Sequence, residues 1–325
     1  MERNHVTIKD VARESGCSVA TVSRVLNNVN MYYSNETKER VEAAVRKLNY
    51  IPNMNAKGLK ENRSRNIVYL VPHMDDYYVR ILNVMQKIAN ENGYSQVVLN
   101  SDYSEEQELR HIKHILEMRY DGVIVATGFL NKINIEETFR GIPVVFLEHH
   151  DDEDSIPTVA VDVESLCTKA VEYLYQKGNK RIAFVSAPCM FKTLTDRYEG
   201  YKKGLSNCGL EFDQSLVYFD DLYMSTDFEE CKVAMEQILK DHTFDSILIM
   251  SDWAAAAAQK LSQERGERLD VIGFDNLPFT EYLTPRLCTI DQNSTQIGEQ
   301  GMKMMLAILG GEKPRNVYLE GELIV

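Results

Sequence analysis

Two short amphipathic helices at the amino-terminal end are the first elements that the apolar pattern predicts. In the first helix the apolar residues recur at i, i+3 and i+4 on one face: Ile8, Val11 and Ala12. Gly16 then interrupts the pattern and can take a left-handed turn without Cβ strain. Ser18 caps a second helix, whose apolar stripe consists of Val22, Val25 and Leu26. Two short helices joined by a tight turn containing Gly predict a helix-turn-helix, whose second helix lies in the major groove of DNA. An ordinary αα-hairpin is the alternative.

Caps and breakers set the limits of the amino-terminal helices. Thr7 and Asp10 resemble a capping box in which Asp replaces the usual Glu. Ser34 caps a third helix, which ends before Pro52 and has an apolar face of Val41, Ala44, Val45 and Leu48. The segment beyond Pro52 is polar and basic. Gly58 lowers its helix propensity by about 1 kcal/mol, so a helix there is marginal on its own.

From Asn66 onwards, apolar runs alternate with helical patterns. The runs that predict strands are 67–72, 97–101, 123–126, 143–147, 181–186, 246–251 and 269–275. The patterns that predict helices are near 78–92, 105–118, 164–177, 194–208, 226–240 and 253–264. This alternation is typical of parallel sheets with right-handed crossovers, which place ligands outside the carboxyl ends of the strands. The predicted fold is therefore α/β, with a helix-turn-helix domain followed by two doubly wound, Rossmann-like subdomains.

Charge is divided unevenly along the 325 residues, whose net charge is −13. Residues 1–66 carry 12 Lys and Arg against 7 Asp and Glu, so the remaining residues hold 24 against 42. A basic head on an acidic body is expected when only the head meets phosphate. No apolar run approaches the ~18 residues of a membrane span, and we find no secretory signal. The six cysteines are scattered without a CxxC pair, which indicates reduced thiols. These features predict a cytoplasmic protein of two or three domains.

Distinctive motifs occur along nearly the whole chain. The head contains TIKDVA, SVATVSRVLNN and ETKERV, and the remainder contains YDGVIV, DRYEGYKKGL, SDWAA and VIGFDN. Together they resemble the motifs of the LacI/GalR family of bacterial transcription regulators. The resemblance implies a periplasmic-binding-protein-like core. It divides the chain into a head (1–52), a hinge helix and linker (53–66), an amino-terminal core subdomain (67–161 and 292–319) and a carboxyl-terminal core subdomain (162–291 and 320–325).

On the second helix, Val19 and Ala20 occupy the positions that read bases in the family. Since both are apolar, they would contact thymine methyl groups, and Arg24 would be the partner of a guanine unless it contacts a phosphate instead. Helix capping or solvation is the alternative for several short polar groups of the head that are suited to phosphate contacts. These groups belong to Thr7, Ser18, Thr21, Ser23 and Asn27.

The family's hinge pattern stands here as Pro52, Asn53, Ala56 and Leu59, and we assign the adjacent Lys60 to the DNA-binding set. In similar proteins a leucine at the Leu59 position wedges into a base step of the minor groove, and the hinge helix folds only on DNA. Wedging unstacks and kinks the duplex. The alternative for Leu59 is packing against the core.

Arg197 and Asp275 resemble the family's effector-binding pair, since a guanidinium fork and a carboxylate suit adjacent sugar hydroxyls. Asp252 follows the strand 246–251, and the adjacent Trp253 is either an apolar platform or a core residue. Further lining is predicted from the first subdomain: His73, Tyr77, Tyr78 and Glu148. Three positions depart from what is common in the family. The stretch 73–78 stands where Asn-Pro-Phe-Phe is common in the family, Glu148 where Asp is common, and Ser251 where Asn is common. These departures leave the effector's identity open.

The residues 149–154, HHDDED, could suggest a metal site, but adjacent residues rarely converge on one ion, so we interpret them as a solvated loop. No GxSxG, HExxH or P-loop motif occurs, and we expect no enzyme activity, metal or cofactor.

The sequence therefore predicts a homodimeric repressor that binds double-stranded operator DNA. Its affinity for the operator would be changed by a small-molecule effector, a sugar or sugar phosphate, that closes or rotates the subdomains. A regulator controlled by a protein co-effector of the phosphocarrier type is the alternative. A carbohydrate-binding transport protein without a regulatory role is a weaker one.

Overall fold

The structure, a computed structural model, describes residues 6–27, 33–51, 63–126, 135–148, 156–189, 191–220, 225–240 and 242–325. The chain divides into two compact units, Met1–Ser64 and Arg65–Val325. Within the described residues, no helix is long and apolar enough to cross a membrane.

The described residues of the amino-terminal unit form three helices around a small apolar core. They are α1 (Ile8–Ser15), α2 (Val19–Leu26) and α3 (Asn35–Leu48). One valine from each helix is fully buried at the centre: Val11, Val22 and Val41. The turn between α1 and α2 has Gly16 at φ 65°, in the left-handed region that favours glycine. This arrangement confirms the predicted helix-turn-helix.

The caps of the first two helices form at the predicted residues. The backbone N–H and the hydroxyl of Thr7 both donate to Asp10 Oδ2, at 2.9 and 2.6 Å. Thr7 and Asp10 therefore form the predicted capping box, in which the Thr7 side chain also accepts from the Asp10 N–H. Ser18 Oγ accepts from the Thr21 N–H at 3.1 Å, as expected of an N-cap.

A long-range contact that the sequence did not reveal holds the turn in place. Arg40 of α3 donates from Nη2 to the Ser15 carbonyl at 2.6 Å and to the Gly16 carbonyl at 3.3 Å. Its Nε also donates to Ser15, at 3.2 Å. Carbonyls at the end of α1, which lack partners within the helix, are thus satisfied by a charged donor from α3.

Arg40→Ala is expected to loosen the turn, because hydrogen bonds to charged groups contribute about 1.5–3 kcal/mol. Backbone amides of α1 and α2 should exchange with solvent about ten to a hundred times faster in hydrogen-exchange mass spectrometry of the full chain. Arg46→Ala is the matched control, since the Arg46 side chain is exposed and its ion pair with Glu42 is long, at 3.9 Å. Equal exchange in both variants would contradict a clamp at the turn.

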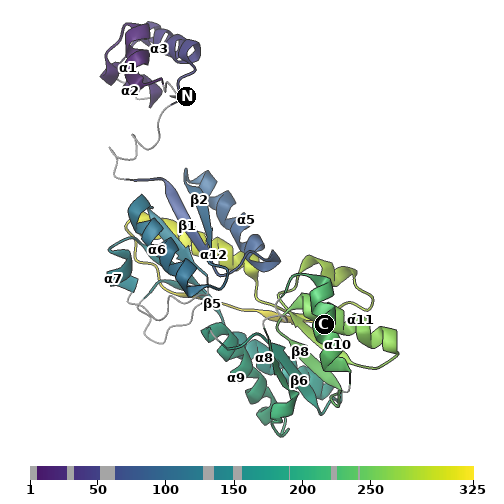
Figure 1. The fold of residues 1–325 in the computed structure, drawn as a ribbon. Helices are drawn as coiled ribbons and strands as arrows, with labels where there is room; N and C mark the ends of the chain where they lie inside the picture. Colours follow the sequence, from purple (N-terminus) through teal and green to yellow (C-terminus); the bar gives the residue numbers. More distant parts are fainter. Residues whose placement is uncertain are drawn as a thin grey trace. The chain divides into compact units, whose positions relative to one another are not determined.

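The first sheet of the core unit is parallel, with strand order β11-β5-β4-β3-β1-β2 (Figure 1). Its strands are β1 (Asn66–Val71), β2 (Ser95–Asn100), β3 (Gly122–Val125), β4 (Val144–Leu147), β5 (Thr158–Val161) and β11 (Val317–Leu319). Helices α5 (Asp76–Glu91) and α12 (Ser294–Leu309) pack on one face, where Tyr69 is fully buried. Helices α6 (Glu105–Met118) and α7 (Ile135–Phe139) cover the other face.

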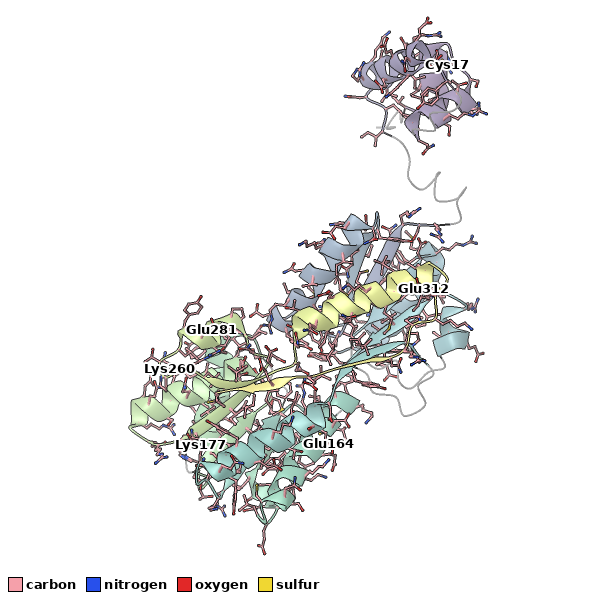
Figure 2. All side chains as sticks on the ribbon, turned by 180° about the vertical axis from the view of Figure 1, so that it is seen from behind. Cys17, Glu164, Lys177, Lys260, Glu281 and Glu312 are labelled. Atoms are coloured by element: carbon pink, nitrogen blue, oxygen red, sulfur yellow. The ribbon has the colours of Figure 1, made fainter. Side chains whose placement is uncertain are left out.

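The second sheet has the order β12-β10-β9-β8-β6-β7, and only the β10–β12 pair is antiparallel. Its strands are β6 (Ile182–Ser186), β7 (Val217–Phe219), β8 (Ser246–Ile249), β9 (Asp270–Phe274), β10 (Cys288–Asp291) and β12 (Glu322–Ile324). One face carries α8 (Val163–Gln176), which Figure 2 shows between Glu164 and Lys177, and α9 (Lys192–Asn207). The other carries α10 (Phe228–Leu239) and α11 (Asp252–Arg265). Short 3-10 helices lie at Gln214–Leu216 and Pro278–Tyr282. The two sheets confirm the predicted doubly wound fold.

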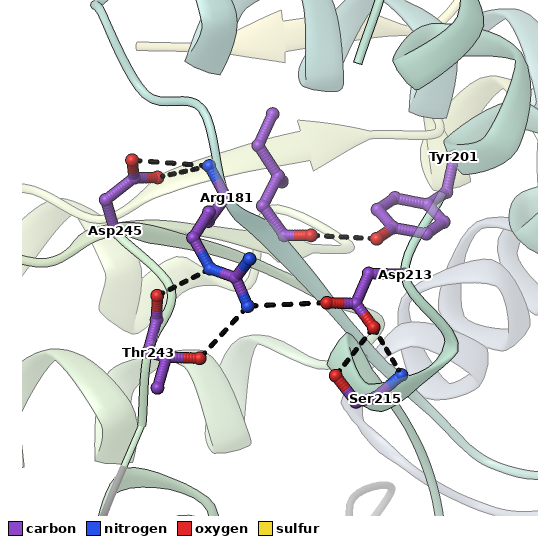
Figure 3. Close-up of polar contacts among 7 residues, drawn as sticks. Arg181, Tyr201, Asp213, Ser215, Thr243 and Asp245 are labelled. Carbon is purple, nitrogen blue, oxygen red and sulfur yellow. Dashed lines mark hydrogen bonds and ion pairs between the residues drawn. The ribbon is translucent and has the colours of Figure 1, made fainter. Parts of the chain in front are cut away.

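Arg181 joins the segments that lead into the second sheet (Figure 3). Its backbone N–H donates to the Asp245 carboxylate at 3.2 Å, and its guanidinium donates to the Thr243 carbonyl at 2.8 Å and to Asp213 at 3.3 Å. Because these residues precede β6 and β8, the cluster lies at the amino ends of the strands. Ligand sites of such sheets lie at the carboxyl ends, so we interpret this cluster as structural.

Helices α8 and α9 approach closely at two glycines. A Cβ atom at Gly200 would overlap the Glu164 carbonyl oxygen, and one at Gly204 would lie 2.6 Å from the Val171 Cβ. Thr168 Oγ1 bridges the helices by donating to the carbonyls of Glu164 and Gly200, at 2.8 and 3.1 Å. Small residues are therefore required on this face of α9.

Gly200→Ala is expected to lower the free energy of unfolding of the core by about 1–3 kcal/mol, because α9 must move away from α8. Urea unfolding monitored by circular dichroism measures this change. Ser206→Ala, at an exposed position of the same helix, should change stability by less than about 0.5 kcal/mol. A stability loss as large in Ser206→Ala would mean that the close helix contact is not the cause.

Candidate functional site

The exposed side of α2 carries the residues predicted to read bases. Val19, Ala20 and Arg24 are exposed, Val19 to 41%, whereas Val22 and Val25 are buried against α1 and α3. An apolar pair at the start of the helix is thus followed, one turn later, by a long cationic side chain. This is a suitable surface for thymine methyl groups and a guanine edge.

The polar residues predicted to contact phosphate form local hydrogen bonds. Ser18 Oγ and Thr21 Oγ1 lie 2.8 Å apart, and Asn27 Nδ2 donates to the Ser23 carbonyl at 2.8 Å. Together with the Thr7–Asp10 pair, these bonds correspond to the capping alternative. The predicted hinge residues Asn53, Ala56, Leu59 and Lys60 lie outside the described residues, as does the run 149–154.

A cavity of about 690 Å³ lies at the carboxyl ends of strands from both sheets of the core unit. Six of the eight predicted effector residues line it: His73, Tyr77, Tyr78, Glu148, Arg197 and Asp275. Its size is that of a small-molecule site, and its position is the one expected for parallel α/β sheets.

Two carboxylates occupy equivalent places in the two subdomains. Glu148 follows β4 and Asp275 follows β9, and both have a positive φ, of 64° and 99°. Non-glycine residues rarely adopt this backbone region, which costs of order 1–3 kcal/mol and is found preferentially at functional sites. The chain therefore turns at the end of each strand in a way that directs a carboxylate into the cavity.

Burial dominates the electrostatics of these carboxylates. It raises the pKa of Glu148 to about 7, although the Tyr77 hydroxyl, which donates to Glu148 Oε1, and the Arg197 charge act in the opposite direction. Burial likewise raises the pKa of Asp275 to about 6, opposed by Arg197 and by Gln292 Nε2, which donates to Asp275 Oδ1 at 2.7 Å. Burial also raises the pKa of Asp75, the N-cap of α5, despite the hydrogen bond from the Tyr78 N–H.

Arg197 extends from α9 into the cavity and is only 8% exposed. Its guanidinium carbon lies 4.0 Å from the centre of the Phe274 ring, a cation–π distance, and its buried Nε has no hydrogen-bond partner among the described residues. A buried donor without a partner is costly. A ligand oxygen would satisfy it.

An aromatic wall crosses the cavity from one subdomain to the other. Tyr103 stacks on His73 with ring centres 5.7 Å apart and on Phe191 with centres 5.9 Å apart. Tyr103 and Phe191 were not predicted from the sequence. Tyr103 could have been found, since it follows the strand at 97–101 and so lies at the sheet edge where ligands bind.

The predictions for Asp252 and Trp253 require correction, because neither residue lines the cavity. Asp252 is 1% exposed and accepts from the Leu277 N–H at 2.7 Å and from the Thr289 hydroxyl at 2.6 Å. Trp253 packs on Phe279 with ring centres 4.4 Å apart. Both side chains turn towards the loop that follows β9, so Asp252 holds the Asp275 loop instead of contacting a ligand.

Arg80 is a further residue that the sequence did not single out. It extends from α5 of the first subdomain and donates to the carbonyls of Asp275 and Asn276 in the second, the latter at 2.9 Å. Since Asp275 also lines the cavity, this contact joins the two subdomains next to the cavity.

Comparisons with known proteins agree with both parts of this description. A family model described as "Bacterial regulatory proteins, lacI family" matches residues 7–53, and one described as "Periplasmic binding proteins and sugar binding domain of LacI family" matches residues 64–324. The HTH-type transcriptional regulator RegA of Clostridium acetobutylicum is 34% identical over 323 residues, which cover 96% of this chain and 95% of RegA. The ribose operon repressor of Halalkalibacterium halodurans is 32% identical over 320 residues, which cover 96% of this chain and 92% of that repressor.

Among solved structures, the Lac repressor dimer bound to operator and the anti-inducer ONPF has a TM-score of 0.87. The alignment covers 99% of this chain and 98% of that one, at 24% identity. This likeness supports the fold of the chain.

Proposed function

This chain belongs to the LacI family of bacterial regulatory proteins, and we propose that it is a homodimeric repressor whose effector is a sugar bound in the core cavity. The protein is a sequence-specific DNA-binding transcriptional regulator whose operator affinity responds to a small molecule. The observation that carries the effector proposal is the cavity at the strand ends, with the strained Asp275 and the unpartnered Arg197 Nε in its wall. As a regulator of operator DNA it would act in the cytoplasm, and no enzyme activity is part of the proposal.

For the DNA interface, we propose that Val19, Ala20 and Arg24 read bases while Thr7, Ser18, Thr21, Ser23 and Asn27 set the register on phosphates. The position of Val19, Ala20 and Arg24 on the exposed side of α2 supports a base-reading role for them. The resemblance to the family assigns Asn53, Ala56, Leu59 and Lys60 to the hinge on DNA, with Leu59 as the minor-groove wedge. Two heads related by two-fold symmetry would read the two half-sites of a near-palindromic operator.

For the core, we propose the subdomain boundaries 67–161 with 292–319, and 162–291 with 320–325. Strand membership supports them, because β1 to β5 and β11 form one sheet while β6 to β10 and β12 form the other. An effector held by residues of both subdomains, such as Glu148 and Arg197, would favour one relative orientation of the two. That change would be transmitted to the hinges.

The character of the cavity favours a sugar over a sugar phosphate and over a protein co-effector. Carboxylates outnumber cationic side chains in its described lining, and a phosphate would add further negative charge next to them. A phosphocarrier protein would dock on an outer surface and would leave the Arg197 Nε without a partner. The small-molecule interpretation accounts for both features.

The test is operator binding by the full-length protein, with an operator selected from random duplex DNA. Affinity is expected to fall about a hundredfold or more between about 50 and about 200 mM salt, since each phosphate contact contributes to the slope of log K against log salt. A slope near zero would remove the DNA-binding interpretation. A panel of sugars should contain one that changes operator affinity, and a core that binds none would refute the effector proposal.

A further inference from the structure

The cavity contains more negative charge than the recognition of neutral hydroxyls requires. Among its described lining residues, Arg197 is the one guanidinium and there is no lysine. The same lining includes six carboxylates: Asp75, Asp102, Glu148, Asp227, Glu230 and Asp275. Three of these have local functions, since Asp102 pairs with His73 at 3.2 Å, Asp227 caps α10, and Glu230 accepts from Ser225 at 2.7 Å. Asp75, Glu148 and Asp275 remain as the inner group.

The inner carboxylates lack a close ionic partner among the described residues, although the charge of Arg197 acts on Glu148 and Asp275. None of the three forms an ion pair of 4.0 Å or less with a described residue, and their hydrogen bonds come from neutral donors. In Glu148 and in Asp275, only one of the two carboxylate oxygens accepts a hydrogen bond from a described residue. Burying a carboxylate without compensation is costly, so the cavity as a whole favours a cation.

Other features of the wall show which kind of cation fits. The aromatic wall of His73, Tyr103 and Phe191 offers the apolar surface on which a sugar ring packs, and aromatic faces also attract cations. The buried Arg197 Nε needs an oxygen acceptor, which a simple amine does not have. The ligand should therefore combine an ammonium group with hydroxyl oxygens.

We propose that the effector is an amino sugar with a free, protonated amine, whose ammonium group faces Glu148 and Asp275 and whose hydroxyl oxygens accept from Arg197. This proposal rests on the proposed function, because it takes the core cavity to be the effector site. An ammonium group has three donors, enough to reach the unused oxygen of each carboxylate. Such charge-assisted bonds are about twice as strong as neutral ones.

The experiment is calorimetric titration of the full-length protein with matched sugars. The probes are D-glucosamine, D-galactosamine and D-mannosamine, each compared with its parent hexose and its N-acetyl derivative. For the hexosamine that binds, we expect at least about tenfold tighter binding than for its parent or its N-acetyl form, in which the charge is absent. The 6-phosphate of the same hexosamine should bind more weakly, because its phosphate repels the carboxylates.

Two variants separate the charge of the inner group from the shape of the cavity. Glu148→Gln keeps an acceptor for the Tyr77 hydroxyl but removes one negative charge, so the affinity for the hexosamine should fall about tenfold, and by more than the affinity for the parent sugar falls. Glu230→Gln is the matched control, since the Glu230 carboxylate is already engaged by Ser225. It should leave the preference for the amine unchanged.

Proton release provides an independent readout. Burial raises the pKa of Glu148 to about 7 and that of Asp275 to about 6. The other polar or charged groups that affect these two pKa values are Tyr77, Arg197, Asp75, Gln292 and Arg80. A bound ammonium would lower both pKa values, so binding would release protons and would tighten as the pH rises from about 5.5 to about 7. Glu148→Gln should reduce that slope.

The outcomes distinguish this inference from the proposed function. Parent or N-acetyl hexoses that bind as tightly as the amine, or a phosphate that binds more tightly, would overturn the amino-sugar assignment and leave a sugar effector in place. A core that binds neither the amines nor the parent sugars would overturn both.

Discussion

Arg197→Ala is expected to abolish the effector response while operator binding without effector is retained. Arg197 is the one guanidinium of the described cavity lining, and its buried Nε has no described protein partner. The hydrogen bonds that we propose it donates to the effector would be charge-assisted and contribute about 1.5–3 kcal/mol, so their loss would weaken effector affinity about ten- to hundredfold. The head lies in a separate compact unit with its own apolar core, so its folding does not depend on Arg197.

Fluorescence anisotropy of labelled operator, titrated with effector, measures this response. Arg197→Lys should recover only part of it, because lysine keeps the charge but lacks the planar fork of donors. Arg181→Ala is the matched control, since Arg181 belongs to the same subdomain but contacts Asp213, Thr243 and Asp245 at the opposite ends of the strands (Figure 3). If Arg197→Ala releases DNA at the same effector concentration as the unaltered protein, the cavity is not the effector site.

Asp275→Asn is expected to weaken the effector response for a related reason. The substitution keeps the size of the side chain but removes the charge and one of two acceptors. Gln292 Nε2 donates to Asp275 Oδ1, so the amide oxygen of the substituted side chain can retain that contact. The change should therefore affect ligand affinity more than stability, and urea unfolding in parallel with the operator assay separates the two.

Local sequence signals were sufficient for the head and for most of the parallel strands. The capping residues Ser18 and Ser34 and the left-handed Gly16 mark helix limits by their own chemistry, and these are realised. The strands within the runs 181–186 and 246–251 are mostly apolar and buried at every position, because both faces of a doubly wound sheet are covered. Such signals depend only on neighbours in sequence.

The elements that the sequence did not reveal are helices α7 and α12 and strands β5, β7, β10, β11 and β12. Strands β7, β11 and β12 have three residues each, too few for a periodic pattern, and they lie at the edges of the sheets. Helix α12 follows Asn293, whose side chain makes no cap hydrogen bond. Edge strands form where the rest of the sheet already provides a partner.

The candidate site shows the same division. Residues that follow apolar strands, such as Glu148 and Asp275, were found because the ends of parallel strands are where ligands bind. Arg80 was missed, because its contact with residues 275 and 276 crosses between the subdomains and has no signature within α5. Asp252 was assigned to the wrong function, since a carboxylate after a strand has the same appearance in the sequence whether it faces a ligand or a loop.

Asp252→Ala is expected to produce the largest loss of stability among the substitutions in this part of the core. The carboxylate accepts from the buried Leu277 N–H and from the buried Thr289 hydroxyl, and Gly273 leaves room for it, since a Cβ there would overlap Asp252 Oδ1. Alanine leaves both donors without their acceptor, at about 1–3 kcal/mol each, so a loss of about 2–5 kcal/mol is expected in urea unfolding. The loop that carries Asp275 would lose its anchor, and effector affinity should fall with it.

Asp252→Asn tests the same contacts without emptying the site. Its amide oxygen can accept from the Leu277 N–H while its NH2 group donates to Thr289 Oγ1, so the loss should be well below that of alanine. Burial raises the pKa of Asp252 to about 8, above the value of an unfolded aspartate. The proton is therefore held more tightly in the folded state, and the stability that this group contributes below about pH 4 is lost as the pH rises through about 8. The asparagine variant should lack this contribution, so its stability should fall less between about pH 4 and about pH 8 than that of the unaltered protein. An equal pH dependence in both proteins would show that Asp252 is ionised throughout and that its two donors, rather than its proton, hold the loop.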